Sequence, residues 1–362
     1  MKPKNRAAKI AVQLVGFLIA IALFGWAVSM GFSEENRGGL ERLRDAGPLP
    51  IAQLIGLSLV VVATNGFVFW LTMIPVRRLR LRDIQAANGL CTLLAFLPFK
   101  LGAITRVAIH RQRDGVPVML VGAWWAAILV VFAGGVAPVL LATIVADSMG
   151  LMWWATVAAS MVATTLIIWR LSGVFEGPKG MARLRALMLA ERFSLIGKLL
   201  HSDAAHHLHS AFRMTDHLKV VTGCHVLRLV DIGAQAGRIA IAAGVVGLTI
   251  SPHEAVALAL GSVLIMMASP VGLVGTREAG VVALAAWMGL TDGIGEETSD
   301  QLALALLVVT GSDLIAVLVA AGVGVGWLGP HRLFEKGAGS PPPAPTMRSD
   351  EDRPMPDQPD DR

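Results

Sequence analysis

Six apolar stretches, each long enough to cross a lipid bilayer, constrain the fold of this chain more than any other feature. A transmembrane helix needs about 20 consecutive, mostly apolar residues. The predicted spans cover residues 9–32, 50–74, 116–146, 150–171, 219–250 and 301–328. Backbone polar groups in the hydrocarbon core need partners within the chain, so a spanning segment is a helix or part of a closed barrel. No barrel-type alternation is visible, and the predicted fold class is an all-α integral membrane bundle.

The composition agrees with this class. The chain is 54% hydrophobic and 16% charged, whereas soluble domains contain about 25% charged residues. The first stretch differs from a cleaved signal peptide, because its apolar core of about 20 residues exceeds the 7–15 expected of a signal. We therefore predict an uncleaved anchor. Residues 1–330 form one polytopic membrane domain, and the proline-rich segment 331–362 is predicted to be a disordered tail.

Two further apolar segments, 84–112 and 253–290, are interrupted by helix-breaking and charged residues. The second contains the run Pro270-Val-Gly272-Leu-Val-Gly275-Thr-Arg277-Glu278. A charge near the bilayer centre costs about 2.5–3.5 kcal/mol on insertion scales. Broken backbone at that depth is tolerated only within protein or beside a water-filled cavity. The pattern predicts two half-helices that meet at a polar turn.

The first interrupted segment has the same design. It contains the run Leu97-Pro98-Phe-Lys100-Leu-Gly102-Ala-Ile-Thr105-Arg106. Proline and arginine are eight residues apart here and seven residues apart in the second segment. Interrupted helices at corresponding places in two halves of a chain are typical of inverted-repeat transporters. We predict two re-entrant helix pairs in addition to the six full spans.

The distribution of Lys and Arg predicts the orientation. Basic residues crowd the N-terminus and the segment 77–82, and cytoplasmic loops carry such an excess. The chain is therefore predicted to lie in the inner membrane, with both termini in the cytoplasm. The first re-entrant pair then enters from the cytoplasm and the second from outside. Within the cytoplasmic segment 176–217, residues 181–217 are predicted to form a basic amphipathic helix on the anionic leaflet.

The intramembrane polar residues are the candidate binding site. Arg277 is predicted to face a cavity and bind an anionic head group, because guanidinium offers bidentate donors to phosphate. Glu278 would orient Arg277 or bind a cation or proton. An alternative is a structural ion pair, or a pair near the membrane surface. The glycines and prolines of the two turns complete the candidate substrate-binding set: Pro98, Pro270, Gly272 and Gly275.

The first half contributes Arg106 and Lys100 as counterparts. The alternative for them is a cytoplasmic loop that anchors to lipid head groups. Asn88 lies on the leading half-helix and either lines the same cavity or bridges helices. In the last span Asp313 needs a partner at that depth, and Arg277 or Arg238 is the natural candidate.

Other polar groups are given structural interpretations. Arg228 and Asp231 are three residues apart on one helix and are predicted to pair. Cys91 and Cys224 are predicted to pack in apolar surroundings. The histidines 201, 206, 207 and 209 are interpreted as a solvated face and not as a zinc site. We find no motif of a nucleotide site or a catalytic centre, so we predict no cofactor, no metal, no nucleic-acid partner and no enzymatic activity.

The two interrupted motifs also carry a family resemblance. The segments 97–106 and 270–280 are similar to two motifs of the flippase-like family that includes the transmembrane half of lysylphosphatidylglycerol synthases. The resemblance covers roughly residues 10–330, and its second motif is the more specific. It implies a lipid-translocating fold with inverted re-entrant repeats. The residues to which it gives functional weight are Arg106, Arg277 and Glu278.

The resemblance leaves the lipid unassigned, because the family spans aminoacylated phospholipids, glycolipids and isoprenoid- or hopanoid-linked lipids. It implies no synthase activity, because the soluble aminoacyl-transferase half of those synthases is not expected in this chain. Taken together, the sequence predicts translocation of a lipid with an anionic or zwitterionic head group. Arg277 and Arg106 would draw that head group into a polar groove. One alternative is an accessory scaffold for an envelope-lipid biosynthetic enzyme. Another is an intramembrane transferase that uses Glu278 or Asp313 as a base.

Overall fold

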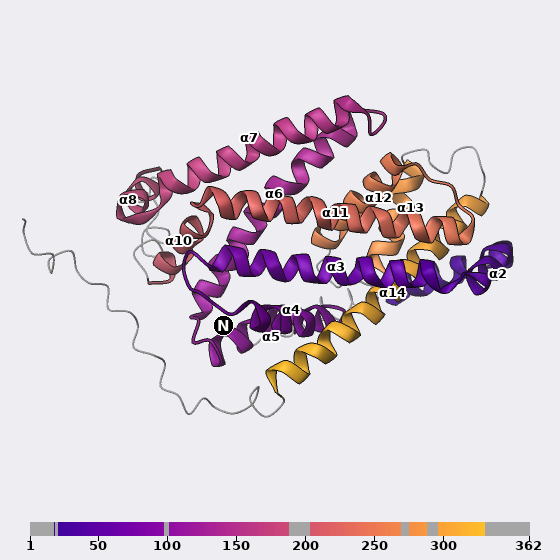
Figure 1. Ribbon diagram of the computed structural model, residues 1–362, viewed down its shortest axis with the longest axis horizontal. Coiled ribbons are helices and arrows are strands. Elements are labelled where there is room, and N and C mark those ends of the chain that lie inside the picture. The colour runs from indigo at the N-terminus through magenta and orange to yellow at the C-terminus, as the bar shows by residue number, and fades with distance from the viewer. Residues whose placement is uncertain are drawn as a thin grey trace, which may run out of the picture.

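The structure is a computed structural model, and it describes residues 18, 21–97, 101–187, 203–268, 275–287 and 296–329. All regular secondary structure in these ranges is helical (Figure 1). The predicted tail, 331–362, lies outside the described residues. The predicted all-α class is confirmed for the part of the chain that is described.

Five helices are long and apolar enough to cross a membrane. They are α3 (Pro48–Met73), α6 (Val118–Val145), α7 (Leu151–Phe175), α11 (Leu218–Val246) and α14 (Glu296–Leu328). The shortest of them has 25 residues, which exceeds the length needed to span a bilayer. The chain is therefore built as a multi-pass membrane protein. Of the sixth predicted span, 9–32, the structure describes mainly a shorter apolar helix, Ile21–Gly31.

The ends of the long helices follow local sequence rules. Helix α3 begins at Pro48, where the missing N–H costs nothing because the first turn has no acceptor for it. Helix α11 ends before Gly247, whose φ of 89° is the left-handed conformation that closes a helix. Its backbone N–H donates to the carbonyls of Ala243 and Gly244. These signals set the lengths of the spans within the apolar stretches.

Each interrupted segment is a pair of short helices packed against each other. The first pair is α4 (Leu81–Ala95) with α5 (Leu101–Gln112), and the second is α12 (Pro252–Ala268) with α13 (Thr276–Trp287). A glycine lies at each contact. A Cβ atom at Gly102 would lie 2.2 Å from the carbonyl oxygen of Cys91, and one at Gly280 would lie 2.8 Å from the Ile265 side chain. Absence of a side chain therefore lets the two helices of each pair approach closely.

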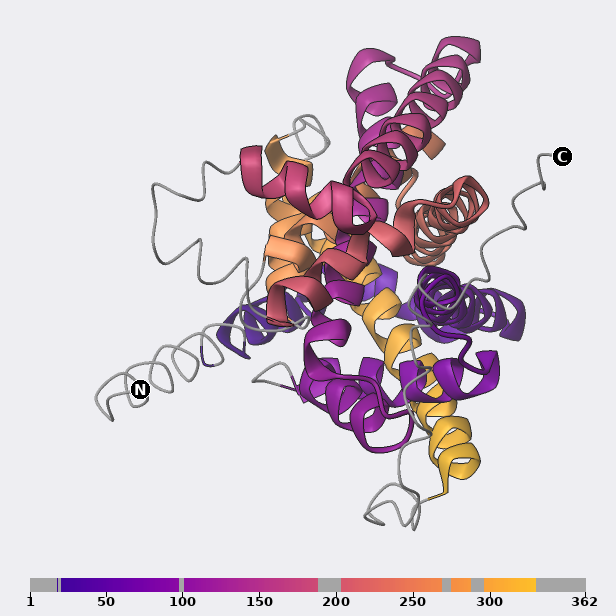
Figure 2. The same ribbon diagram turned by 90° about the vertical axis from the view of Figure 1, so that its left-hand side faces the viewer.

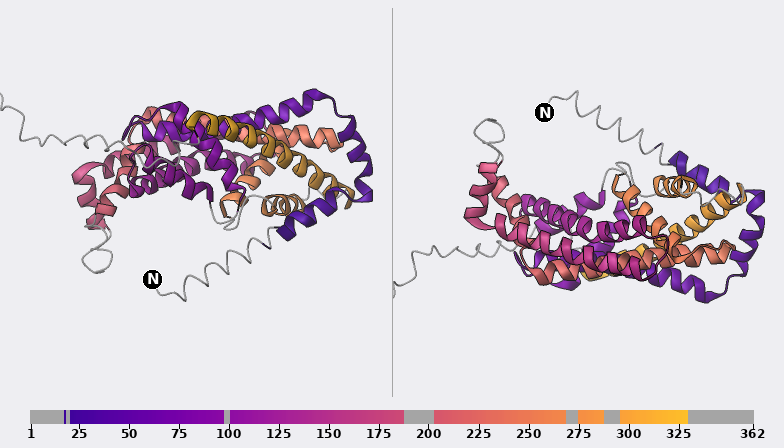
Figure 3. Two further views of the ribbon diagram at one scale, coloured as in Figure 1. Left: turned by 90° about the horizontal axis from the view of Figure 1, so that it is seen from below. Right: turned by 90° about the horizontal axis from the view of Figure 1, so that it is seen from above.

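The two helix pairs occupy opposite halves of the molecule along its long axis. Figure 1 places α4 and α5 toward the end with α8 (Gly177–Leu187) and α10 (Asp203–Thr215). It places α12 and α13 toward the end with α2 (Arg37–Asp45), and Figure 3 shows the same arrangement. This placement agrees with the prediction that the two helix pairs enter the membrane from opposite sides. The re-entrant course and the inverted repeat themselves stay predictions.

The long helices assemble around two apolar cores. Helices α3 and α11 lie side by side and appear nearly end-on in Figure 2. The larger core joins α6, α11, α12 and α14, and a second core joins α3, α6 and α10. Trp124 is fully buried in the second core, where its indole N–H donates to the Phe69 carbonyl and the Thr72 hydroxyl.

Helix α4 packs against α14 through a glycine on each side. A Cβ atom at Gly89 would lie 2.6 Å from the carbonyl oxygen of Ala320. A Cβ atom at Gly324 would lie 2.5 Å from the carbonyl oxygen of Ala86. The two backbones therefore touch without intervening side chains, as in close helix crossings within membranes.

The polar segment 176–217 differs from the single surface helix predicted over 181–217. The described parts are two helices, α8 and α10, and α10 packs on α6 and α7. Met214 is fully buried, and the Thr215 and Ser172 hydroxyls lie 2.7 Å apart. The apolar residues at the end of α10 are therefore covered by protein and not by lipid. The placement of residues 188–202 lies outside the described part of the chain.

Candidate functional site

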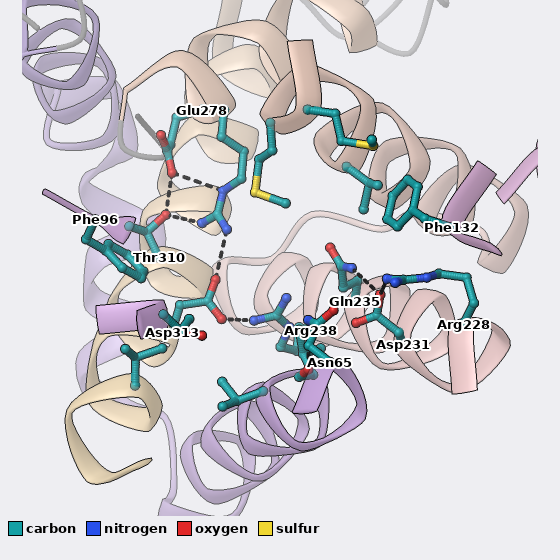
Figure 4. A pocket seen from close by; sticks show the side chains of 18 residues that line it. Asn65, Phe96, Phe132, Arg228, Asp231, Gln235, Arg238, Glu278, Thr310 and Asp313 are labelled. Atoms are coloured by element: carbon teal, nitrogen blue, oxygen red, sulfur yellow. Dashed lines mark hydrogen bonds and ion pairs between the residues drawn. The ribbon is translucent and has the colours of Figure 1, made fainter. Parts of the chain in front are cut away.

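A cavity of about 260 Å³ lies where both helix pairs meet the long helices. Its walls come from α3, α4, α6, α11, α12, α13 and α14, and Figure 4 shows the side chains that line it. Charged side chains gather on α11, α13 and α14, whereas α12 contributes Val263, Met266 and Met267. The cavity is thus polar on one side and apolar on the other.

Arg277 is the centre of the polar side. Its Nε donates to Glu278 Oε1 at 3.2 Å, one terminal nitrogen donates to Asp313 Oδ2 at 2.8 Å, and the other donates to Thr310 Oγ1 at 2.5 Å. The Thr310 hydroxyl also donates to Glu278 Oε1 at 2.5 Å. Arg277 and Glu278 thus form an ion pair that lines the cavity, and hydrogen bonds to Thr310 and Asp313 connect this pair to α14.

The start of α13 explains how the pair is oriented. Gly275 adopts a φ of 87°, a conformation that favours glycine. Its backbone N–H donates to Glu278 Oε2 at 2.7 Å. A carboxylate that accepts from the first turn is favourable at a helix N-terminus. Glu278 is fully buried and both of its oxygens are occupied, so it holds Arg277 in position and is poorly placed to act as a base.

Asp313 joins two arginines from different helices. It accepts from Arg277 and also from Arg238 of α11. Arg238 donates in addition to the Ser58 hydroxyl at 2.9 Å, and the hydroxyls of Ser58 and Ser312 lie 3.3 Å apart. The predicted partners of Asp313 are confirmed, and it binds both. The Asp313 side chain is 13% exposed, so this junction is accessible from the cavity.

A second charged cluster lines the same cavity on α11. Arg228 donates to Asp231 Oδ2 at 2.5 Å, and the Gln235 amide donates to the same oxygen at 3.3 Å. The guanidinium of Arg228 also lies 4.2 Å from the centre of the Phe132 ring. The predicted pairing of Arg228 with Asp231 is confirmed, but its position on the cavity was not predicted. The spacing of residues 228, 231, 235 and 238 puts all four side chains on one helix face. This spacing is the sequence signal from which a shared position on the cavity could have been predicted.

The charges of the cavity balance. Three arginines and three carboxylates line it: Arg228, Arg238, Arg277, Asp231, Glu278 and Asp313. Each arginine donates to at least one carboxylate. Charges taken out of water cost several kcal/mol unless paired and hydrogen-bonded, so the balance makes these six charges tolerable within an apolar bundle. A charged ligand would enter by exchanging partners within this network.

Arg106 and Asn88 do not line the cavity. Arg106 is 3% exposed, its NH2 group donates to Asn88 Oδ1 at 2.6 Å, and its guanidinium lies 3.7 Å from the centre of the Phe69 ring. Asn88 donates to the carbonyl of Val62, which does line the cavity. Helix α4 reaches the cavity through Thr92 and the following Phe96 instead. The structure therefore does not bring Arg106 together with Arg277, contrary to the shared groove predicted from the sequence.

Four of the predicted site residues cannot be placed. Pro98, Lys100, Pro270 and Gly272 lie outside the described residues. Among the described residues, those brought together on the cavity from the predicted set are Arg238, Arg277, Glu278 and Asp313. Gly275 supports them through its bond to Glu278.

Comparisons of the chain with protein-family models, with curated proteins and with solved structures found no match. The resemblance to the flippase-like family therefore stays a prediction that rests on the motifs quoted above.

Proposed function

We propose that the protein moves a phospholipid, or another lipid with an anionic or zwitterionic head group, between the leaflets of a membrane. The observation that carries this proposal is the charge-balanced cavity inside a bundle of apolar, membrane-length helices. Ionisable residues at such positions are costly and usually mark a substrate pathway. Three guanidinium groups around one cavity suit a phosphate, because each offers several fixed donors.

A neighbouring apolar groove favours a lipid over a small water-soluble anion. The groove has a volume of about 500 Å³ and lies between α3, α4 and α14. Val62 lines both the groove and the cavity. Along α14 the cavity is lined by residues 310–317 and the groove by residues 319–327, so the groove continues the cavity along the same helix. A head group in the cavity would thus have a path for its acyl chain beside it.

The proposed mechanism is an exchange of ion-pair partners. A phosphate that approaches Arg277 and Arg238 replaces Asp313, which is shared by both. Both arginines keep a counter-ion during the exchange, and the remaining cost is that of the displaced Asp313 carboxylate, which gives up its two cations. Movement of the α12–α13 pair against the rest of the bundle would then expose the cavity to alternate sides.

Leaflet exchange of labelled lipids tests the proposal directly. The purified protein is reconstituted into liposomes that contain a fluorescent phosphatidylglycerol or phosphatidylethanolamine, and a membrane-impermeant reductant quenches the outer-leaflet label. We expect quenching to proceed beyond the outer-leaflet fraction in protein-containing vesicles only. Quenching that stops at that fraction for every head group tested would count against translocation and favour the accessory-scaffold alternative.

Filling the groove is expected to slow exchange of lipids without affecting the cavity. Ala63 lines the groove and is half-buried, so Ala63→Phe places an aromatic ring where the acyl chain would lie. Val60 is exposed on the same helix and lines neither space, so Val60→Phe is the matched control. We expect about a tenfold slower exchange in Ala63→Phe, which corresponds to about 1.4 kcal/mol of lost interaction, and no change in the control. Equal rates in the two variants would exclude the groove from the lipid path.

A further inference from the structure

Five polar side chains form a buried stripe along one face of α11. They are His225, Arg228, Asp231, Gln235 and Arg238, and each is at most 6% exposed. Their spacing of three or four residues keeps them on one helix face. The stripe runs over fourteen residues, from His225 to Arg238, or about 20 Å along the helix. Four of the five line the charged cavity, and His225 extends the stripe beyond it.

The three carboxylates of the cavity are not equivalent. Both oxygens of Glu278 and both oxygens of Asp313 accept hydrogen bonds. Asp231 differs, because its two donors, Arg228 and Gln235, share Oδ2. The other oxygen, Oδ1, is buried and has no donor among the described residues. A buried acceptor without a donor costs about 1–3 kcal/mol, so this oxygen is the open acceptor of the network, in which Arg228 Nε and Arg238 Nε also lack partners among the described residues.

The charged and titratable groups around Asp231 come from three helices. Helix α11 itself contributes Arg228, Arg238 and His225, α13 contributes Arg277 and Glu278, and α14 contributes Asp313. The cavity-lining residues of α3, α4, α6 and α12 are uncharged. Arg228 has Asp231 as its only carboxylate partner among the described residues, whereas Asp313 serves both Arg238 and Arg277. A change in the charge of Asp231 therefore acts first on Arg228.

We propose that Asp231 binds the proton that accompanies an anionic head group across the membrane. This inference rests on the proposed function. A proton from water in the cavity forms an O–H bond at Oδ1, and Asp231 becomes neutral. Arg228 then loses its counter-ion, and the cavity changes from balanced to one net positive charge. One phosphate anion restores the balance, so proton and head group bind together and leave together.

The coupling predicts electroneutral transport of a lipid with one negative charge. One proton and one phosphatidylglycerol anion move in the same direction, so no net charge crosses the membrane. A pH difference of one unit should then drive labelled phosphatidylglycerol to a leaflet ratio of about tenfold. A membrane potential of either sign should leave that ratio unchanged. If the anionic head group moved without a proton, the leaflet ratio would respond to the membrane potential and not to the pH difference.

Proton binding is tested first on the purified protein, without any lipid transport. Infrared difference spectra between acidic and neutral pH report the carbonyl band of a protonated carboxylic acid. The chain has 26 Asp and Glu residues, so the signal sought is the component that the wild type, Glu278→Gln and Asp313→Asn share and that Asp231→Asn lacks. Difference spectra of Asp231→Asn that superimpose on those of the wild type would overturn the assignment.

Coupling is tested in proteoliposomes with labelled phosphatidylglycerol, under an imposed pH difference or an imposed potassium diffusion potential. The wild type should respond to the pH difference only. Asp231→Asn should lose the response to the pH difference, because no titratable carboxylate remains at this position. Exchange by the wild type that ignores the pH difference would overturn the coupling and leave translocation standing. No exchange under either condition would overturn translocation and the coupling with it.

Discussion

Arg277→Ala is expected to lose lipid exchange by at least about a hundredfold. Arg277 alone contacts Glu278, Thr310 and Asp313 together, and so joins α13 to α14 at the cavity. A hydrogen bond to a charged group is worth about 1.5–3 kcal/mol, so losing two donors to the phosphate costs about 3 kcal/mol or more, and each 1.4 kcal/mol is a factor of ten. The measurement is the quenching rate of labelled phospholipid in proteoliposomes at equal amounts of folded protein. Arg277→Lys should recover part of the rate, because it keeps the charge but loses the fork of donors.

Two controls separate a loss of function from a loss of fold. The double variant Arg277→Met with Glu278→Gln removes a positive and a negative charge together, so the cavity stays balanced and the fold should survive while exchange is lost. Arg106→Met removes a buried arginine that does not line the cavity. It should lower thermal stability but keep the exchange rate per folded molecule. Full exchange by the folded double variant would exclude Arg277 from the lipid path.

Gly324→Leu is expected to disrupt the packing of α4 on α14, with the largest stability loss of any single glycine substitution on α14. The added side chain would meet the Ala86 carbonyl oxygen, which lies 2.5 Å from the Cβ position. A backbone carbonyl cannot move aside as a side chain can. The loss of stability should therefore exceed the range of about 1–3 kcal/mol that is usual for overpacked cores. Melting of the detergent-solubilised protein, followed by scanning fluorimetry or by loss of the monodisperse peak, measures the effect.

Gly326→Leu on the same helix is the matched control. A Cβ atom at Gly326 meets nothing within 4 Å, and the two substitutions have the same helix propensity and the same change in volume. The control should melt within a few degrees of the wild type. Similar melting of the two variants would mean that α4 and α14 are not in backbone contact.

Much of the fold follows from sequence patterns with one physical cause. Apolar stretches of membrane length must be helical, because lipid offers no hydrogen-bond partners, and five of the predicted spans correspond to long helices. Each of the segments 84–112 and 253–290 contains two short helices, as predicted, and the interruption between the two helices includes residues outside the described ranges. The partners of Asp313 were predictable because a lone carboxylate at that depth needs a cation.

The composition of the site was harder to predict, because it depends on how helices rotate and cross. Arg106 and Arg277 occupy matching places in their motifs, but Phe69 and Asn88 enclose Arg106 away from the cavity. Thr310 carries no charge and sits within an apolar span, so no sequence signal singled it out. The apolar residues of α10 could likewise face either lipid or protein as judged from the sequence. Only the observed packing of α10 on α6 shows that they contact protein.

The backbone contacts of Gly89 with Ala320 and of Gly324 with Ala86 divide the bundle into a rigid unit and a part that can move against it. Backbones that touch without side chains have few alternative arrangements, so α4 and α14 must travel as a single unit. Helix α13 is held to α14 differently, through hydrogen bonds and ion pairs of Arg277 that a ligand can replace one by one. We therefore expect distances measured by spin labels between α4 and α14 to stay constant when lipid is added. Those between α13 and α14 should broaden or shift.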